Sequence, residues 1–169
     1  MASHGRFCGG SEVTQLRYSG TFDVPRDIGS ILPFLEDPDR LFSSVPGVEK
    51  IDAVDGKVRV KFRLDLRSLG VADAGGYMST ITSVMFFEHR FDGRTFSMTG
   101  KGRSAGSSIS TEITVLLYPE NDGTTRLDWS ATVDPGLIMS VLGKTKVSAA
   151  SDVLIKLIID GFRLAVSAT

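Results

Sequence analysis

The stretch LIMSVLGKTKVSAASDVLIKLIIDGFRLAV, residues 137–166, decides the fold of this chain of 169 residues. Its apolar residues recur at the three- and four-residue spacing of a helix, which predicts one long amphipathic helix. Most of the chain between residues 48 and 133 reads instead as extended segments. A curved antiparallel sheet that holds one long helix usually encloses an apolar cavity, so we expect the functional site to be such a cavity.

Seven segments before this helix have the composition and alternation of β-strands. The clearest of them, KVRVKFRLDL at residues 57–66, alternates apolar with charged residues, so that one face is buried and the other exposed. Short turns such as Asp55-Gly56 and Asp92-Gly93 join the later segments and make neighbouring strands antiparallel. The predicted strands are residues 14–24, 48–54, 57–66, 77–91, 95–102, 107–118 and 124–133.

Two short, broken helices are predicted between the first and second strands. Asp27 is placed to cap a helix over residues 28–35. Asp37-Pro38 ends that helix, because proline disfavours helical backbone in the residue before it, and a second helix covers about residues 39–44. The whole order predicts an α+β fold, in which a curved antiparallel sheet of about seven strands wraps around the C-terminal helix.

At about 100° per residue, the long helix sorts into an apolar and a charged face. The residues expected to face the sheet are Val147, Ala150, Leu154, Leu157, Ile158, Gly161 and Leu164. Small residues early in this face leave two alternatives: a pocket near the start of the helix, or close approach of the helix to the sheet. Ile155, Ile159 and Phe162 fall outside the face and predict an outward contact patch, unless strand ends or the N-terminal segment cover them.

Inward positions of the strands and of the helix supply the expected cavity wall. The predicted wall residues are Phe62, Leu64, Phe96, Met98, Ile113, Val115, Trp129, Val147, Ala150 and Leu154. The aromatic residues among them are more typical of a core or cavity wall than of nucleic-acid stacking, because the net charge is only −1. We therefore expect a hydrophobic small molecule as the ligand, and no nucleic-acid partner.

Few residues have the potential for chemistry. Glu88-His89-Arg90 is the only cluster with acid–base potential, and it adjoins a hairpin turn, where charged residues are usually only solvated. Residues 100–106, GKGRSAG, have the glycines of a phosphate loop, but a strand follows them, so we expect a bend in the sheet. The chain has one cysteine and two histidines, and we predict no catalytic residue, no metal site and no cofactor.

The N-terminal residues and the hydropathy of the chain indicate where in the cell the protein is located. Residues 1–13 are small and polar and predict a flexible tail, and residues 14–169 are expected to form a single domain. No apolar run approaches the roughly 18–20 residues that span a bilayer, and the first residues lack the apolar core of a signal peptide. We expect a cytoplasmic protein without a transmembrane segment. Peripheral contact with a membrane surface remains compatible with the sequence.

Several short motifs and the order of the elements point to one known family. The motifs are YSGTFDVP (18–25), LEDP (35–38), VPGV (45–48), GKG (100–102), GS (106–107) and TRLDW (125–129). Over residues 18–166 the chain resembles the family of the carbon monoxide dehydrogenase G subunit, which belongs to the helix-grip superfamily together with birch-pollen-allergen-like and lipid-transfer proteins. The resemblance implies a soluble accessory protein that binds a lipid or quinone in an apolar cavity, with a molybdenum hydroxylase as its partner. The chain ends at Thr169 without the C-terminal tail that some relatives use for membrane contact, so ligand binding is expected more than membrane recruitment.

Three functions are compatible with the sequence. The first is non-enzymatic binding of a hydrophobic small molecule. The second is a small enzyme of the same superfamily, a cyclase or a hydrolase, which needs a pair of titratable groups that point into the cavity. The third is an interaction module that forms a homodimer or docks through Ile155, Ile159 and Phe162.

Overall fold

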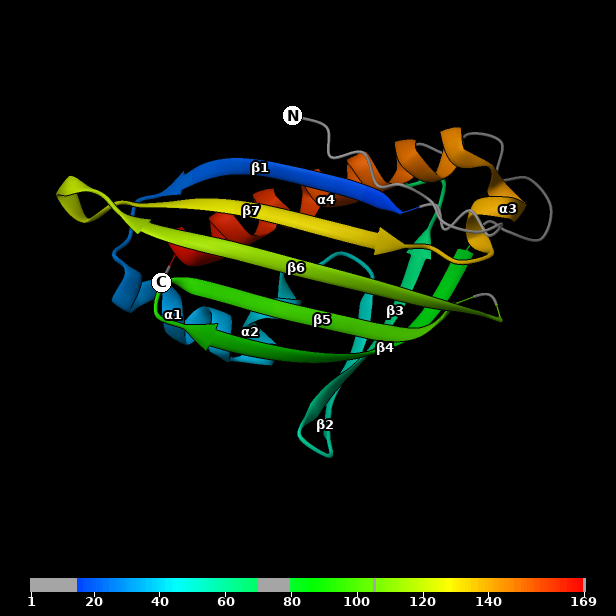
Figure 1. Ribbon diagram of the computed structural model, residues 1–169, viewed down its shortest axis with the longest axis horizontal. Helices are drawn as coiled ribbons and strands as arrows, with labels where there is room; N and C mark the ends of the chain where they lie inside the picture. Colours follow the sequence, from blue (N-terminus) through cyan, green and yellow to red (C-terminus); the bar gives the residue numbers. More distant parts are fainter. Residues whose placement is uncertain (1–14, 70–79, 105, 169) are drawn as a thin grey trace, which may run out of the picture.

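A seven-stranded antiparallel sheet forms the body of the structure (Figure 1). The computed structural model describes residues 15–69, 80–104 and 106–168. The strands are β1 Leu16–Val24, β2 Val48–Val54, β3 Lys57–Asp65, β4 Thr80–Asp92, β5 Thr95–Ser104, β6 Ser107–Pro119 and β7 Thr125–Asp134. Their spatial order is β1-β7-β6-β5-β4-β3-β2, so β1 and β2 are the two edge strands.

The α-helices lie on one side of the sheet, which we call its inner face; the opposite side is the outer face. The helices are α1 Ile28–Glu36, α2 Pro38–Ser43, α3 Ile138–Leu142 and α4 Lys144–Ser167, and a short 3-10 turn, η1, covers Asn121–Gly123. In Figure 1, α4 passes behind β1 and β7, and α1 and α2 lie behind one end of the sheet. None of the helices in the described ranges combines the length and apolar character needed to cross a lipid bilayer.

The predicted strands and the two short helices are confirmed to within a few residues. The hairpin at Asp55-Gly56 has positive φ at both residues, 50° and 76°, as a tight turn matched to the twist of the strands requires. β5 continues to Ser104, so part of the glycine-rich stretch expected to bend lies inside a strand, and Gly106 (φ 76°) is a turn residue directly before β6. The predicted tail, residues 1–13, and the first residues of the strand predicted at 77–91 lie outside the described residues.

Aspartates cap both short helices. The Asp27 carboxylate accepts a hydrogen bond of 2.9 Å from the Ser30 backbone N–H at the start of α1, as expected. Hydrogen bonds from the Ser30 side chain and backbone lower the pKa of Asp27. Asp37 accepts from the Asp39 backbone N–H at 3.0 Å, which begins α2 directly after α1 ends.

The long C-terminal helix is interrupted, contrary to the prediction of one continuous element. Gly143 has φ 86°, in the left-handed region, and it separates α3 from α4. Its backbone N–H donates to the Met139 carbonyl oxygen at 2.9 Å, which closes the last turn of α3. The apolar periodicity continues across this glycine, so the pattern alone does not reveal the break.

α4 is also rotated relative to the predicted orientation. Val147 and Ala150 are buried as expected. Phe162, predicted to face outward, is only 8% exposed, whereas Leu157 and Leu164, predicted to face the sheet, are 43% and 73% exposed. The outward contact patch that included Phe162 was therefore a wrong prediction, and a homodimer built on these three residues loses its structural basis.

Two apolar clusters fill the space between the helices and the sheet. The buried residues of the larger cluster are Val24, Ile31, Phe34, Leu35, Phe42, Val60, Met85, Phe87, Phe96, Met98, Leu117, Leu127, Phe162 and Val166. Those of the smaller cluster are Leu16, Leu66, Leu69, Ile81, Ile138, Val147 and Ala150. The first turns of α4 thus belong to the smaller cluster and its last turns to the larger one.

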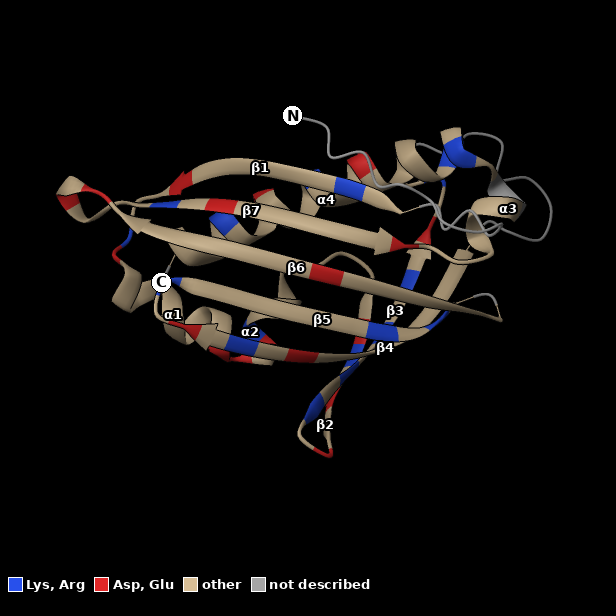
Figure 2. Cartoon of the chain, in the orientation of Figure 1, with Lys and Arg blue, Asp and Glu red and all other residues tan. Residues whose placement is uncertain are grey.

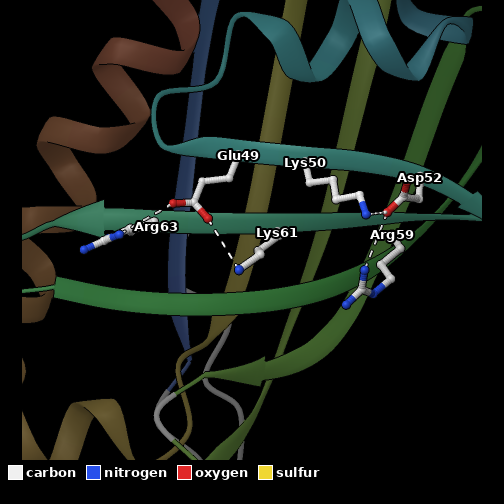
Figure 3. A network of polar contacts seen from close by, with 6 residues as sticks. All are labelled: Glu49, Lys50, Asp52, Arg59, Lys61 and Arg63. Carbon is white, nitrogen blue, oxygen red and sulfur yellow. Dashed lines mark ion pairs between the residues drawn. The ribbon is translucent and has the colours of Figure 1, made fainter.

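Charged residues lie along several strands, and those of the β2–β3 hairpin form ion pairs across the two strands (Figure 2). There, Glu49 lies 3.6 Å from Lys61 and 4.0 Å from Arg63 (Figure 3). Asp52 makes the same kind of double contact with Lys50 and Arg59. Exposed ion pairs of this kind contribute little stability, but charges along an edge strand oppose pairing with another chain.

Candidate ligand-binding cleft

A cleft of about 300 Å³ opens between the edge strand β1 and the middle of α4. Its lining residues are Tyr18, Ser19, Trp129, Asp152, Ile155, Lys156, Ile159 and Asp160. The floor and walls are mainly apolar, and the charged residues of α4 stand at the rim. An apolar interior with a few polar groups at the edge is typical of sites for small hydrophobic ligands.

The cleft lies where α4 packs least closely. No residue of α4 from Ser151 to Gly161 is buried, although buried residues precede and follow this stretch. The two apolar clusters therefore hold the helix at its ends and leave its middle partly uncovered. At the start of the helix, Val147 and Ala150 are buried in the smaller apolar cluster, and the cleft lies further along α4.

On the strand side, the cleft depends on a glycine. Gly20 in β1 lies opposite Trp129 in β7. A Cβ atom at Gly20 would come within 2.9 Å of Trp129 Nε1, so any side chain there would displace the indole ring. Glycine at this position lets the ring lie over the backbone of the edge strand, where it forms one wall of the cleft.

On the helix side, two isoleucines one turn apart form the opposite wall. Ile155 and Ile159 are partly buried and line the cleft, instead of facing outward as predicted. Beside them, Lys156 Nζ donates to Asp160 Oδ2 at 2.8 Å, and this ion pair lies on the exposed rim. Because Lys156 and Asp160 pair with each other, this rim places no unpaired charge of theirs against the apolar interior of the cleft.

Aromatic packing anchors α4 one turn beyond the last residues that line the cleft. The ring of Phe162 meets Phe22 at 6.1 Å and Phe34 at 5.4 Å between centroids, both in edge-to-face geometry. The guanidinium group of Arg163 covers the Phe22 ring at 5.7 Å. Because β1, α1 and α4 all contribute to this contact, it fixes the rotation of the helix.

Tyr18 connects the cleft with the smaller apolar cluster. Its ring packs against the smaller apolar cluster and lines the cleft. Its hydroxyl oxygen is buried and makes no hydrogen bond with any residue in the described ranges. Tyr18 and Trp129 are diagonal neighbours across β1 and β7 on the inner face, since Tyr18 pairs with Ala131 and Trp129 with Gly20.

The inner face continues from the cleft into the middle of the sheet. Val115 in β6 lies next to Trp129, and Ile113 lies next to Ala131. All of these side chains are only partly buried, although β6 and β7 are interior strands and these side chains lie on the side of the sheet that the helices cover. The sheet surface beneath the helix is therefore incompletely covered beside the cleft.

The ten predicted wall residues divide among three locations. Trp129 lines the cleft. Phe62, Phe96, Met98, Ile113 and Val115 belong to the larger apolar cluster or pack on it, and Leu64, Val147, Ala150 and Leu154 do so with the smaller cluster. Sequence reasoning missed Tyr18 as a wall residue. The signal that could have revealed it is Gly20, two positions away on the same face, opposite the only tryptophan of the chain.

The candidate acid–base cluster does not assemble into one site. Strand alternation puts Glu88 and Arg90 on the outer face of β4 and His89 on the other. The His89 ring stacks on Phe96 with centroids 5.9 Å apart. Glu88 lies 3.4 Å from Lys57 beside a second hollow, of about 290 Å³, on the outer face.

Solved structures with the same arrangement are found in several bacteria. A conserved protein from Geobacillus kaustophilus aligns with a TM-score of 0.74 at 13% identity, over 90% of this chain and 96% of that one. A Thermus thermophilus protein aligns with a TM-score of 0.61 at 15% identity, over 90% and 98%. An aromatase/cyclase from Streptomyces sp. R1128 aligns with a TM-score of 0.54 at 17% identity, over 92% and 93%. At these identities the likeness shows the fold alone, which is the predicted helix-grip fold.

Sequence comparison identifies the family. No curated protein sequence matches the chain. The profile of the CoxG family, described as the G subunit of carbon monoxide dehydrogenase, matches residues 20–167, nearly the same range as the predicted resemblance. The match covers well over half of the 169 residues, and the chain therefore belongs to the carbon monoxide dehydrogenase CoxG family.

Proposed function

We propose that this protein binds a hydrophobic small molecule, a lipid or a quinone, in the cleft between β1 and α4, and carries it without changing it chemically. The observation that carries the proposal is the unburied middle of α4 above an apolar cleft walled by Trp129, Ile155 and Ile159. Its volume of about 300 Å³ is at the lower end of the range for small-molecule sites and suits a ring or one segment of a chain.

The absence of an assembled acid–base pair among the described residues of the cleft supports a carrier over a cyclase or a hydrolase. Catalysis by proton transfer needs a donor and an acceptor within reach of the same substrate atoms. In this cleft, Lys156 and Asp160 are paired with each other on the exposed rim. His89 and Glu88, the alternative candidates, lie on opposite faces of β4.

Trp129 provides a direct test, because it is the only tryptophan and it lines the cleft. We expect duroquinone, whose fully substituted ring does not add thiols, to quench the protein fluorescence in a saturable manner. Ile155→Gln is expected to weaken binding about tenfold, because it removes apolar area from the wall. Leu164→Gln, on the exposed side of the same helix, leaves the affinity unchanged.

Free N-acetyltryptophanamide, titrated in parallel, supplies the collisional quenching to be subtracted. Thermal unfolding of both variants establishes that they fold. Quenching that rises linearly without saturation, or equal affinity of the Ile155→Gln and Leu164→Gln variants, would refute binding in this cleft.

Family membership supports a protein partner as well. We propose that the ligand-carrying protein associates with a molybdenum hydroxylase of the carbon monoxide dehydrogenase type, since the family takes its description from such an enzyme. Analytical ultracentrifugation of the chain mixed with a purified carbon monoxide dehydrogenase is expected to show a complex. Two separate boundaries at the highest concentrations reached would contradict this association.

A further inference from the structure

The two edges of the sheet differ in how they are protected from further pairing. The edge strand β2 carries the charged residues Glu49, Lys50 and Asp52, which oppose the approach of another strand. The other edge strand, β1, is nine residues long and pairs only with β7 on one side. In the described ranges, no backbone hydrogen bond outside that pairing involves residues 16–23. Alternate residues of β1 therefore present N–H and C=O groups along this edge.

The sequence of β1 is complementary to itself in the antiparallel direction. We compare LRYSGTFDV, residues 16–24, with a second copy that runs the opposite way, with Gly20 opposite Gly20. The resulting pairs are Leu16 with Val24, Arg17 with Asp23, Tyr18 with Phe22, and Ser19 with Thr21. Opposite charges and aromatic residues directly across from each other stabilise antiparallel strands. One strand thus contains both halves of a favourable pairing.

The charged pair in this register is exposed and accessible. Strand alternation puts Arg17 and Asp23 on the outer face, and both are exposed. Neither forms an ion pair with another residue in the described ranges. Asp23 lies opposite Arg126 of β7, but Arg126 is 3.5 Å from Asp128 and lies over the Tyr118 ring. A register shifted by two residues would separate the two charges, so the register centred on Gly20 is favoured.

We propose that this protein forms a symmetric homodimer in which the β1 strands of two copies pair antiparallel about Gly20 and join the two sheets into one. A two-fold interface repeats every residue pair, so the pair of Arg17 and Asp23 occurs twice. The symmetry axis passes beside the cleft, because Gly20 lies against Trp129 and the neighbouring Tyr18 lines the cleft. In the dimer, the Phe22 side chain of the second copy lies opposite Tyr18 and extends the apolar wall of the site. The inference does not depend on which ligand the cleft binds.

Sedimentation velocity of the full chain tests this interface. We expect a dimer whose fraction rises with protein concentration. Arg17→Asp and Asp23→Arg each place like charges opposite each other at two positions, so each variant is expected to weaken self-association about tenfold or more. Lys101→Asp is the matched control, since it makes the same change in charge as Arg17→Asp on the outer face of the interior strand β5. It is expected to leave the association unchanged.

A mixture of the two edge variants tests the register. In the Arg17→Asp variant both positions are acidic, and in the Asp23→Arg variant both are basic, so the two chains complement each other only when position 17 of one lies opposite position 23 of the other. We expect the mixture to form a heterodimer about as stable as the wild-type dimer. Circular dichroism of each variant establishes that it folds.

Three outcomes would overturn the inference. They are a wild-type protein that stays monomeric at every concentration, a dimer that Lys101→Asp weakens as much as Arg17→Asp does, and a mixture that associates no more than the separate variants. Each of them leaves the proposed binding of a small molecule in the cleft intact.

Discussion

Replacing Phe162 by alanine is expected to lower the free energy of unfolding by about 3–5 kcal/mol, as for a phenylalanine deleted from a packed core. Phe162 is 8% exposed, and its ring contacts Phe22 and Phe34 from two other elements. The cavity left by the substitution cannot collapse easily, because β1 is paired with β7 and α1 is anchored by buried residues of the larger apolar cluster. Urea unfolding followed by circular dichroism measures the change.

Leu164→Ala is the matched control on the same helix. Leu164 is 73% exposed, so its truncation is expected to change the free energy of unfolding by about 0.5 kcal/mol or less. The helical pattern of the sequence predicts the reverse order, with Leu164 on the sheet and Phe162 outside. A larger loss for Leu164→Ala than for Phe162→Ala would show that α4 has the predicted orientation and not the observed one.

Gly102→Ala is expected to cost about 3 kcal/mol or more, or to prevent folding. Gly102 lies near the C-terminal end of β5, and a Cβ atom there would clash with the Val84 carbonyl oxygen and come within 2.7 Å of Met85 Cα. These are backbone atoms of β4, to which β5 is paired, so relief of the contact requires separation of two central strands. If the variant folds, thermal unfolding measures its loss of stability. If it does not fold, a low yield of soluble protein and an unfolded circular dichroism spectrum show this.

The control for this prediction is the same substitution at Gly29, in the first turn of α1. The nearest atom to a Cβ there is Asp27 Oδ1 at 3.9 Å, so the added methyl group has room. Alanine in a helix is favoured over glycine, and Gly29→Ala is expected to raise stability by about 0.5–1 kcal/mol. Equal changes in stability for Gly102→Ala and Gly29→Ala would mean that β4 and β5 lie further apart at Gly102 than in this structure.

The glycines of residues 100–106 illustrate a limit of sequence reasoning. The sequence marks this stretch as unusual, and the interpretation as a phosphate loop is rightly set aside because a strand follows. Glycine in a strand has two common causes, a bend and a close approach of another chain segment, and only the neighbouring strand distinguishes them. Here, Gly100 leaves room for the Phe87 ring, and Gly102 leaves room for the backbone of β4.

The orientation of α4 illustrates another limit. Apolar residues occur on most sides of the helix in the segment VLIKLII, residues 153–159, so more than one face could be chosen as the inner one. Periodicity defines a buried face only where charged residues clearly mark the other side. The contact of Phe162 with Phe22 and Phe34 resolves the ambiguity, and those partners are more than a hundred residues away in the chain.

The sequence by itself determined the strands, the antiparallel neighbours, the two capped short helices and the family, because turns, caps and strand alternation depend on residues close together in the chain. Only the tertiary structure decided the break at Gly143, the rotation of α4 and the position of the cleft beside Tyr18 and Trp129. These depend on which distant side chains meet, and the free energy of packing between elements outweighs local preference there.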